Sequence, residues 1–330
     1  MKKIIVVGAT SNVGSYFAFW ARDYFRGRYE LVATGRKKTD FFSHNGIEYV
    51  CLDMTRREAF DALPQEDVHS VVLMAAAAPS YMEHYSPESY LDVNIKGTFN
   101  ALEYCRKVGV DRVLFMQTTY DIWNRVLRGE KIRPDSPPDY SYTGDHAMYV
   151  ISKNAGIELL EHYHQEYGLG TFVFRFPTIY NYSPFHYYYP NGVKTLRPVY
   201  RMIENAILSK PLEIWGDPNN AKDMVYVADC SQMLCKAIES ERRNGFYNVG
   251  TGVPVTLEEQ VKTIVDVFSP PDKPSQIIYR PDKKCGGFCV MDVESAKVEL
   301  GYQPQYDCRA LFSAYKEEMR LNRFAELLSR

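Results

Sequence analysis

The chain opens on an apolar run that leads directly into a glycine-containing turn, and this start constrains the fold more than any other feature. Residues 3–7 (KIIVV) are continuously apolar, as a strand buried on both faces should be. The turn Gly8–Gly14 follows, and SYFAFWARDYF then has the pattern of a helix. Glycine at such a junction lets the backbone approach a pyrophosphate, which the helix N-terminus attracts. A tight turn without a ligand is the alternative, but its place in the first strand–helix unit favours dinucleotide binding.

The same alternation continues along the first half of the chain. Further strands are expected at 30–35, 47–53, 69–78, 111–119 and 171–176, and helices over 87–108 and 148–163. Strands that alternate with helices predict an α/β fold, a Rossmann-type doubly wound parallel sheet.

After Phe176 the pattern loosens into shorter elements, and prolines and aromatic residues fill 177–192. We therefore expect residues 1–176 to form an NAD(P)-binding Rossmann domain and 177–330 to form mainly a smaller C-terminal, substrate-binding lobe. Segments at about 222–240 are expected to return to the first domain. The final stretch, 309–328, is predicted to be one amphipathic helix.

Composition excludes several classes of protein. The 330 residues carry a net charge of −2, so no overall field attracts nucleic acid or an acidic membrane. The apolar start is too short for a signal peptide, and no stretch approaches a membrane span. We expect a cytoplasmic enzyme.

The seven cysteines include no C-x-x-C pair, which favours reduced thiols. Cys285 and Cys289 have a spacing that could bind metal, but no histidine cluster accompanies them, and we expect no metal site.

Tyr149 and Lys153 are the principal catalytic candidates. They lie four residues apart in a predicted helix, so both side chains project from one face. An ammonium beside a phenol favours the phenolate, which could take a proton from a substrate hydroxyl. Thr119 ends the fifth predicted strand, and its hydroxyl could bond the substrate oxygen on which Tyr149 acts. Each part is common by chance, whereas the order of turn, hydroxyl, tyrosine and lysine is far more specific.

Several further residues are candidate cofactor ligands. Ser11 stands where a middle glycine is usual, and its hydroxyl can donate a hydrogen bond to a phosphate. Asp53 ends the third strand and could accept the adenine amino group, or cap the next helix. Small residues after the fourth strand leave room for a cofactor. The cofactor-binding set is Gly8, Ser11, Asn12, Val13, Gly14, Arg36, Asp53, Met54, Ala75, Ala76, Tyr149, Lys153 and Pro177.

Arg36 decides which dinucleotide is expected. It lies just past the second strand, where an acidic residue would bind the ribose 2′-hydroxyl of NAD. The sequence has no acidic residue there, and Arg36, Lys37 and Lys38 supply positive charge instead. This suits a 2′-phosphate, so NADP is favoured over NAD. A solvated basic loop is the alternative interpretation.

These residues resemble the extended short-chain dehydrogenase/reductase family, in its NAD-dependent epimerase/dehydratase branch that works on nucleotide sugars. The resemblance spans nearly the whole chain. Its motifs are the turn GATSNVG, the helix and strand DVNIKGTFNALEYCRKVGVDRVLFMQTT, and the later segments FRFPTIYN, DMVYVADCSQM and MDVESAKVELGYQP.

The resemblance implies a mechanism and a substrate. Tyr149 would assist hydride transfer between a sugar carbon and the nicotinamide, Lys153 would hold the ribose, and Thr119 would position the substrate oxygen. The expected activity is that of an NAD(P)-dependent oxidoreductase or epimerase, 4-epimerase-like, acting on a nucleotide sugar. The alternatives are an NADP-dependent reductase of a small carbonyl compound and a non-enzymatic dinucleotide-sensing regulator.

The chain departs from the family pattern on the substrate side. Thr178 replaces an asparagine that contacts the nucleotide, Lys222 replaces an arginine, and Arg280 is the candidate for the late diphosphate-binding arginine. Dehydratases carry Thr-Asp-Glu after the fifth strand, where this chain has Thr119-Tyr120-Asp121, so water elimination is not expected. The resemblance makes Thr119, Asp121, Thr178, Lys222 and Arg280 the candidate substrate ligands. It also implies a homodimer formed through the helices at 87–108 and 148–163.

Overall fold

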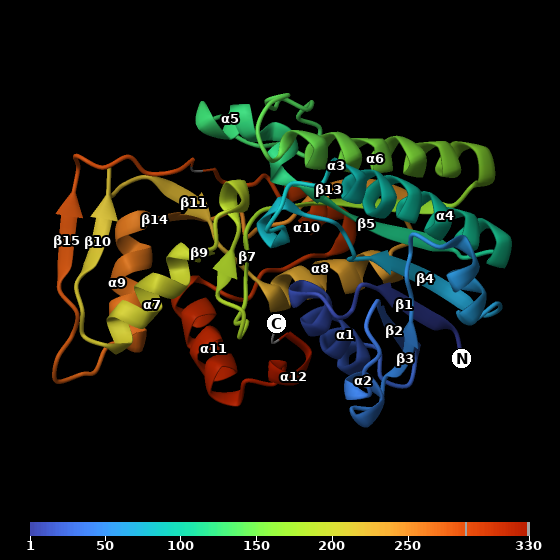
Figure 1. Ribbon diagram of the computed structural model, residues 1–330, viewed down its shortest axis with the longest axis horizontal. Helices are drawn as coiled ribbons and strands as arrows, with labels where there is room; N and C mark the ends of the chain where they lie inside the picture. The colour runs from blue at the N-terminus through green and yellow to red at the C-terminus, as the bar shows by residue number, and fades with distance from the viewer. Residues whose placement is uncertain (288, 329–330) are drawn as a thin grey trace.

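The computed structural model describes residues 1–287 and 289–328, and within these ranges a seven-stranded parallel sheet forms the centre of the molecule (Figure 1). The strand order is β13-β6-β5-β4-β1-β2-β3, which is the doubly wound order expected of a Rossmann-type fold. Its strands are β1 (Lys3–Val7), β2 (Glu30–Gly35), β3 (Glu48–Cys51), β4 (Val68–Leu73), β5 (Arg112–Thr118), β6 (Gly170–Phe176) and β13 (Asn244–Asn248). The predicted fold class is therefore confirmed.

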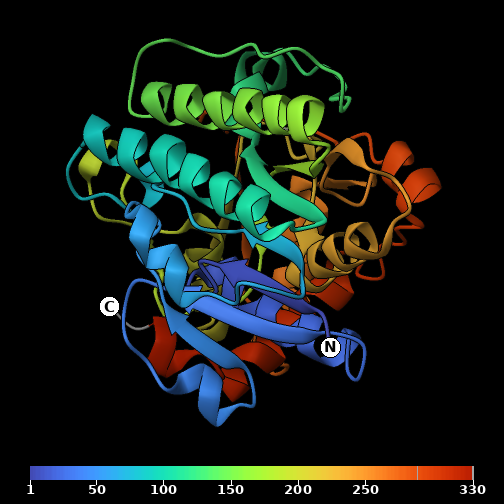
Figure 2. The ribbon, with the colours of Figure 1, turned by 90° about the vertical axis from the view of Figure 1, so that its right-hand side faces the viewer.

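Helices cover both faces of this sheet (Figure 2). On one face α4 (Gly97–Val108) packs beside α6 (Ala147–Tyr167), and on the other α1 (Asn12–Tyr24) packs beside α8 (Val227–Glu239). Gly156 allows α6 to approach the sheet closely, because a Cβ there would lie 2.6 Å from the ring of Phe115 on β5. This close approach places the first turn of α6 beside the carboxyl end of β5.

Two predicted boundaries differ from the structure in the first domain. The fourth strand was expected to reach residue 78, but β4 ends at Leu73 and the alanines after it form a loop. The helix expected over 87–108 begins as α3 (Pro87–Ser89) and passes through a π-helical segment, η3 (Tyr90–Lys96), before α4. Such π-helical insertions are frequent at functional sites. The remaining short elements here are α2 (Phe41–His44), η1 (Arg57–Ala62), η2 (Pro79–Tyr81), η4 (Thr119–Ile122) and α5 (Trp123–Leu127).

The second half of the chain forms short paired strands with helices packed around them, to the left of the main sheet in Figure 1. β7 (Ile179–Tyr180) pairs with β12 (Val225–Tyr226), and β10 (Leu212–Trp215) with β15 (Ile277–Arg280). β8 (Tyr187–Tyr188) pairs with β9 (Thr195–Leu196), and β11 (Ala221–Asp223) with β14 (Pro254–Thr256). The other elements are η5 (Pro190–Gly192), α7 (Pro198–Ile207), α9 (Leu257–Phe268), α10 (Glu294–Leu300), α11 (Cys308–Leu321) and α12 (Ala325–Leu328).

The chain returns to the first domain at α8 and β13. Helix α8 packs on α1, and β13 extends the main sheet by pairing with β6. The single C-terminal helix that we expected is interrupted, because Asn322 adopts a left-handed conformation that ends α11. In the described part of the chain, no helix combines the length and apolar character needed to cross a bilayer.

Candidate active site

Tyr149 lies in the first turn of α6 and is half-buried. Burial raises the pKa of its phenol well above the ordinary value, and a hydrogen bond with the side chain of Thr118 acts in the opposite direction. Other tyrosines surround it, and the ring centre of Tyr90 lies 6.1 Å from that of Tyr149. The phenol therefore sits in a largely apolar setting with one hydroxyl partner.

That partner is Thr118, the neighbour of Thr119, whose hydroxyl we predicted to bond the substrate oxygen. Thr118 is the last residue of β5, and its Oγ1 also accepts a hydrogen bond of 3.2 Å from the backbone N–H of Tyr120. Thr119 begins η4 and is buried, at 8% exposure. Adjacent residues at a strand end point in different directions, and the sequence Thr-Thr could not show which hydroxyl faces the helix.

Lys153 lies one helical turn after Tyr149 and is 3% exposed. Its Nζ is 3.7 Å from the centre of the Phe115 ring. Burial lowers the pKa of Lys153 to about 7. We expected the ammonium of Lys153 to lower the pKa of Tyr149, but burial dominates both groups and Lys153 is not among the main influences on the phenol. The physical reason is that the ammonium faces an aromatic ring.

Asn94, which our sequence interpretation did not select, ties three elements of this site together. Its Oδ1 accepts from the N–H of Ala77 at 2.8 Å, while its Nδ2 donates to the carbonyl of Ala77 at 3.0 Å and to Ser152 at 2.9 Å. Ser152 in turn donates to the carbonyl of Tyr149 at 2.7 Å. In this network both polar atoms of the Asn94 amide form hydrogen bonds, and these bonds hold the loop after β4 against α6. Asn94 lies among other polar residues in YLDVNIK, just before Gly97, so the local sequence did not single it out.

The glycine turn has the geometry that a dinucleotide requires. Gly8 has a φ of +90°, and a Cβ there would lie 2.5 Å from the backbone nitrogen of Ala75. A Cβ on Gly14 would lie 2.3 Å from the carbonyl oxygen of Gly8. Ser11 caps α1 by accepting from the N–H of Gly14 at 3.1 Å, a capping role that we did not predict.

The open backbone donors at this turn fit a pyrophosphate. Because Ser11 takes the N–H of Gly14, the first-turn N–H groups of Asn12 and Val13 remain for an anion at the start of the 13-residue helix α1. The Asn12 side chain is engaged elsewhere, in a reciprocal amide pair with Asn181 at 3.2 and 2.8 Å. This pair holds the turn against the segment that leads into the second lobe.

The adenosine end of the predicted site is only partly as expected. Arg36 follows β2, is exposed, and forms no ion pair with any carboxylate in residues 1–287 and 289–328. Asp53 accepts from the N–H and the hydroxyl of Thr55 at 3.0 and 2.8 Å. Partial burial acts to raise the pKa of Asp53, but these hydrogen bonds, and then Arg36, hold it below its ordinary value. Asp53 thus serves as a local cap, while Met54 is buried against Gly97.

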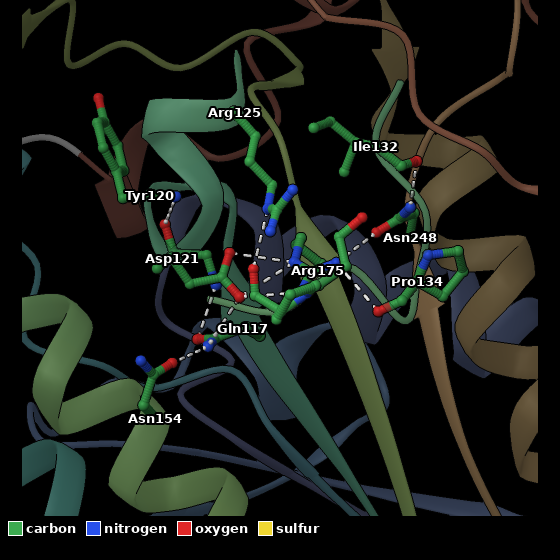
Figure 3. Close-up of polar contacts among 12 residues, drawn as sticks. Gln117, Tyr120, Asp121, Arg125, Ile132, Pro134, Asn154, Arg175 and Asn248 are labelled. Atoms are coloured by element: carbon green, nitrogen blue, oxygen red, sulfur yellow. Dashed lines mark hydrogen bonds and ion pairs between the residues drawn. The ribbon is translucent and has the colours of Figure 1, made fainter. Parts of the chain in front are cut away.

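Asp121 has a structural role rather than the predicted role in the substrate site. Its carboxylate forms an ion pair with Arg175 at 3.0 Å, and the two side chains are 1% and 2% exposed. Arg175 also donates to the carbonyls of residues 133, 134 and 136 and to Asn248, as Figure 3 illustrates for part of this set. Burial raises the pKa of Asp121, while Arg175 opposes that shift. With every oxygen engaged, Asp121 cannot reach a substrate.

The remaining predicted substrate ligands fall into two separate places. Thr178 is exposed and Pro177 half-buried just before β7, and the Nζ of Lys222 lies 5.7 Å from the ring centre of Tyr180 in that strand. Arg280 is instead engaged with Glu213 and Asp282, each at 3.2 Å. The structure therefore gathers Thr178 and Lys222 and gives Arg280 carboxylate partners of its own.

Comparison with known proteins agrees with this geometry. The model of the NAD dependent epimerase/dehydratase family matches residues 4–250. The chain is 28% identical to the dTDP-glucose 4,6-dehydratase of Haemophilus influenzae, over 92% of this chain and 94% of that protein.

Two solved structures share the fold over nearly the full length of both chains. A UDP-N-acetylglucosamine 4-epimerase from Bacillus cereus gives a TM-score of 0.78 at 20% identity, covering 97% of this chain and 100% of the other. A UDP-glucuronic acid 4-epimerase from the same organism, in complex with NAD, gives 0.70 at 18%, covering 96% and 99%. The dinucleotide turn, the α6 tyrosine and lysine, and the match over most of the chain lead to one conclusion: the protein belongs to the NAD dependent epimerase/dehydratase family.

Proposed function

We propose that this protein is a nicotinamide-dinucleotide-dependent oxidoreductase that epimerises a nucleotide sugar at a hydroxyl-bearing ring carbon, in the manner of the 4-epimerases. The observation that carries the proposal is the position of Tyr149 in the first turn of α6, next to Thr118 at the carboxyl edge of the sheet, where the Thr118 side chain acts to lower the pKa of the phenol. Ligands of doubly wound folds bind at this edge. Lys153 lies one helical turn away, and the glycine turn lies at the same edge.

Tyr149 is the general base and acid in this proposal. Its phenol oxygen takes the proton of the sugar hydroxyl during oxidation and returns it during reduction. Thr118, rather than Thr119, holds the sugar oxygen at a fixed distance from the phenol. Thr118 can fill this role because its Oγ1 is already oriented by the N–H of Tyr120.

Lys153 positions the ribose of the dinucleotide and supplies positive charge. The chemistry that a bound nicotinamide supplies is the acceptance and return of hydride. In the structure without ligand the pKa of Lys153 is lowered to about 7 by burial, so its ammonium is only partly populated at neutral pH. Hydrogen-bond acceptors on the bound ribose, close to Nζ, would favour the charged form of Lys153.

We propose NADP as the preferred dinucleotide, with NAD as the alternative. Arg36 supports this preference, since its side chain is exposed beside Asp53 and pairs with no carboxylate in the described chain. A free guanidinium suits a 2′-phosphate. The UDP-glucuronic acid 4-epimerase of similar fold contains NAD, which supports the alternative.

Epimerisation is favoured over water elimination, although a dTDP-glucose dehydratase is among the relatives. Elimination needs a carboxylic acid close to the reacting sugar. Tyr120 stands where the dehydratases carry their aspartic acid, and Asp121, in the place of their glutamate, is buried in an ion pair with Arg175. The proton chemistry therefore rests on Tyr149.

We also propose a homodimer formed through α4 and α6. Leu91, Ile95 and Phe99 recur every four residues along the outer side of η3 and α4, and Leu91 and Phe99 are 46% and 39% exposed. Apolar stripes of this kind mark helix–helix interfaces. Light scattering of the purified protein measures the mass directly.

The experiment that tests the function is a turnover assay on a panel of nucleotide sugars, with NAD and NADP in parallel, followed by chromatographic separation of the C4 epimers. An epimerase interconverts the epimers without net use of dinucleotide and retains its cofactor on purification. A reductase consumes free NADPH in proportion to product, and a regulator binds the dinucleotide without turnover. Absence of any epimer product would contradict the proposal.

A further inference from the structure

A cavity of about 660 Å³ adjoins the proposed reaction centre. Its walls come from the segment after β4 (79–85), the segment that enters α6 (142–148) and the segment 189–192. Tyr90 forms part of the wall, and its ring centre lies 6.1 Å from that of Tyr149, which is not itself among the described lining residues. The cavity is thus placed to receive a substituent of a sugar whose reacting carbon lies at Tyr149.

The wall carries two carboxylates, and histidine rings lie near them. Glu83 and Asp145 line the cavity, and among the described residues no lysine or arginine does. Asp145 is contacted by the ring of His146 at 2.5 Å, and His84 is also in the wall. Arg197 lies over the rings of Tyr81 and Tyr188 and is not among the described lining residues.

The cavity also contains an unused buried hydroxyl. Tyr90 is 0% exposed, and its hydroxyl has no hydrogen-bond partner within the described residues. The pKa of the Tyr90 hydroxyl is raised to about 12, mainly by burial. Tyr85 and Asp145, which both line the cavity, also act to raise it. Because Tyr90 is itself among the residues that line the cavity, a ligand bound there that reaches this hydroxyl could satisfy it. Leaving such a group unpaired costs free energy, so a ligand that pairs with it gains affinity.

We propose that this cavity is a specificity subsite which accepts a neutral, hydroxyl-rich or amine-bearing substituent of the sugar and rejects a carboxylate. The inference rests on the proposed nucleotide-sugar function. Glu83 and Asp145 repel a uronate, and the Tyr90 hydroxyl binds a sugar hydroxyl or amine. Rejection by like charge is a common route to specificity. Besides Tyr90, the cavity is lined by Tyr85 and Tyr142. Tyrosine side chains are amphipathic and therefore suit contact with the hydroxylated ring of a sugar.

The test compares kcat/KM for UDP-glucose, UDP-glucosamine with its free amine, and UDP-glucuronate. We expect the first two to exceed the uronate by about tenfold or more, allowing for solvent screening at the exposed Glu83. The double variant Glu83→Gln/Asp145→Asn should narrow this ratio to within about threefold. Glu88→Gln, which changes a carboxylate outside the cavity on α3, should leave the ratio as it is.

A second variant tests the Tyr90 hydroxyl separately. Because that hydroxyl bonds nothing within the described chain, Tyr90→Phe should leave Tm unchanged yet raise KM for the preferred sugar severalfold. Three results would each overturn the subsite inference while leaving the proposed function intact. They are an equal kcat/KM for UDP-glucuronate, an unchanged kcat/KM ratio between the sugars in the double variant, and an unchanged KM in Tyr90→Phe. No turnover of any nucleotide sugar by the wild type would overturn the proposed function, and the inference with it.

Discussion

The ammonium nitrogen of Lys153 lies 3.7 Å from the centre of the Phe115 ring, in a site where the lysine is 3% exposed. A cation over an aromatic face recovers only part of the solvation lost on burial. Burial accordingly lowers the pKa of Lys153 to about 7 from an ordinary value of 10.5. The protein without cofactor therefore carries an unfavourable group at the position that the proposed mechanism needs.

Replacing that lysine should stabilise the cofactor-free protein. The unfolded chain binds the proton up to a pH of about 10.5 and the folded chain only up to about 7, so this group disfavours folding most below pH 7. Its unfavourable effect fades as the pH rises from about 7 to about 10.5. Lys153→Met should raise the free energy of unfolding by on the order of 2 kcal/mol near neutral pH, with a smaller gain at higher pH. Urea unfolding across this range measures it, with exposed Lys107→Met as control, and a gain that grows with pH would contradict the account.

Thr118 and Thr119 can be separated by matched substitutions. Valine keeps the shape of threonine but lacks the hydroxyl, and only Thr118 shares a hydrogen bond with Tyr149. Thr118→Val should lower kcat by about 10- to 100-fold, whereas Thr119→Val should change it by less than about threefold. Steady-state kinetics on the accepted nucleotide sugar decides between them. A larger loss in Thr119→Val would restore the assignment made from the sequence.

The buried ion pair of Asp121 and Arg175 should matter for stability rather than for substrate binding. Asp121→Asn leaves the guanidinium of Arg175 buried without its charge partner and should cost about 3–5 kcal/mol of unfolding free energy. Asp135→Asn, in the exposed pair with Arg133, should leave the free energy of unfolding nearly unchanged, because solvent screens such a pair. Chemical denaturation compares the two. In the fraction of Asp121→Asn that remains folded, KM should stay within a few-fold of wild type, and a large rise in KM with unchanged stability would contradict this role.

The dinucleotide preference should depend on Arg36. The wild type should bind NADP more tightly than NAD, and Arg36→Gln should reduce that preference by about tenfold, mainly by weakening NADP. Calorimetric titration of both dinucleotides measures the two affinities. Arg26→Gln, another exposed arginine on the same domain, is the control. Equal or tighter binding of NAD by the wild type would show that Arg36 is a solvated loop residue.

The sequence predicted the framework because the framework is set by local patterns. Apolar runs located six of the seven strands of the main sheet, although β4 ends five residues earlier than expected, and β13 was not predicted to join the sheet. Gly8 and Gly14 marked the turn at which backbone atoms approach most closely. Tyr149 and Lys153 could be placed on one helix face because a helix has a fixed period.

What the sequence did not predict depends on tertiary contacts. Only the packing of α6 on β5 selects Thr118 over Thr119, and only burial shows that Lys153 faces Phe115 rather than Tyr149. The partner of Asp121 lies 54 residues away at Arg175, and no local pattern indicates it. The role of Asn94 likewise depends on groups that are distant in the chain.

The most direct measurement is the turnover of Tyr149→Phe with its cofactor bound. Phenylalanine keeps the ring but removes the oxygen that exchanges the proton, so kcat should fall by about 1,000-fold or more, while the affinity for the dinucleotide stays within a few-fold of wild type. Such a result would place proton transfer on the phenol. Turnover close to the wild-type rate, with the dinucleotide still bound, would contradict the central claim.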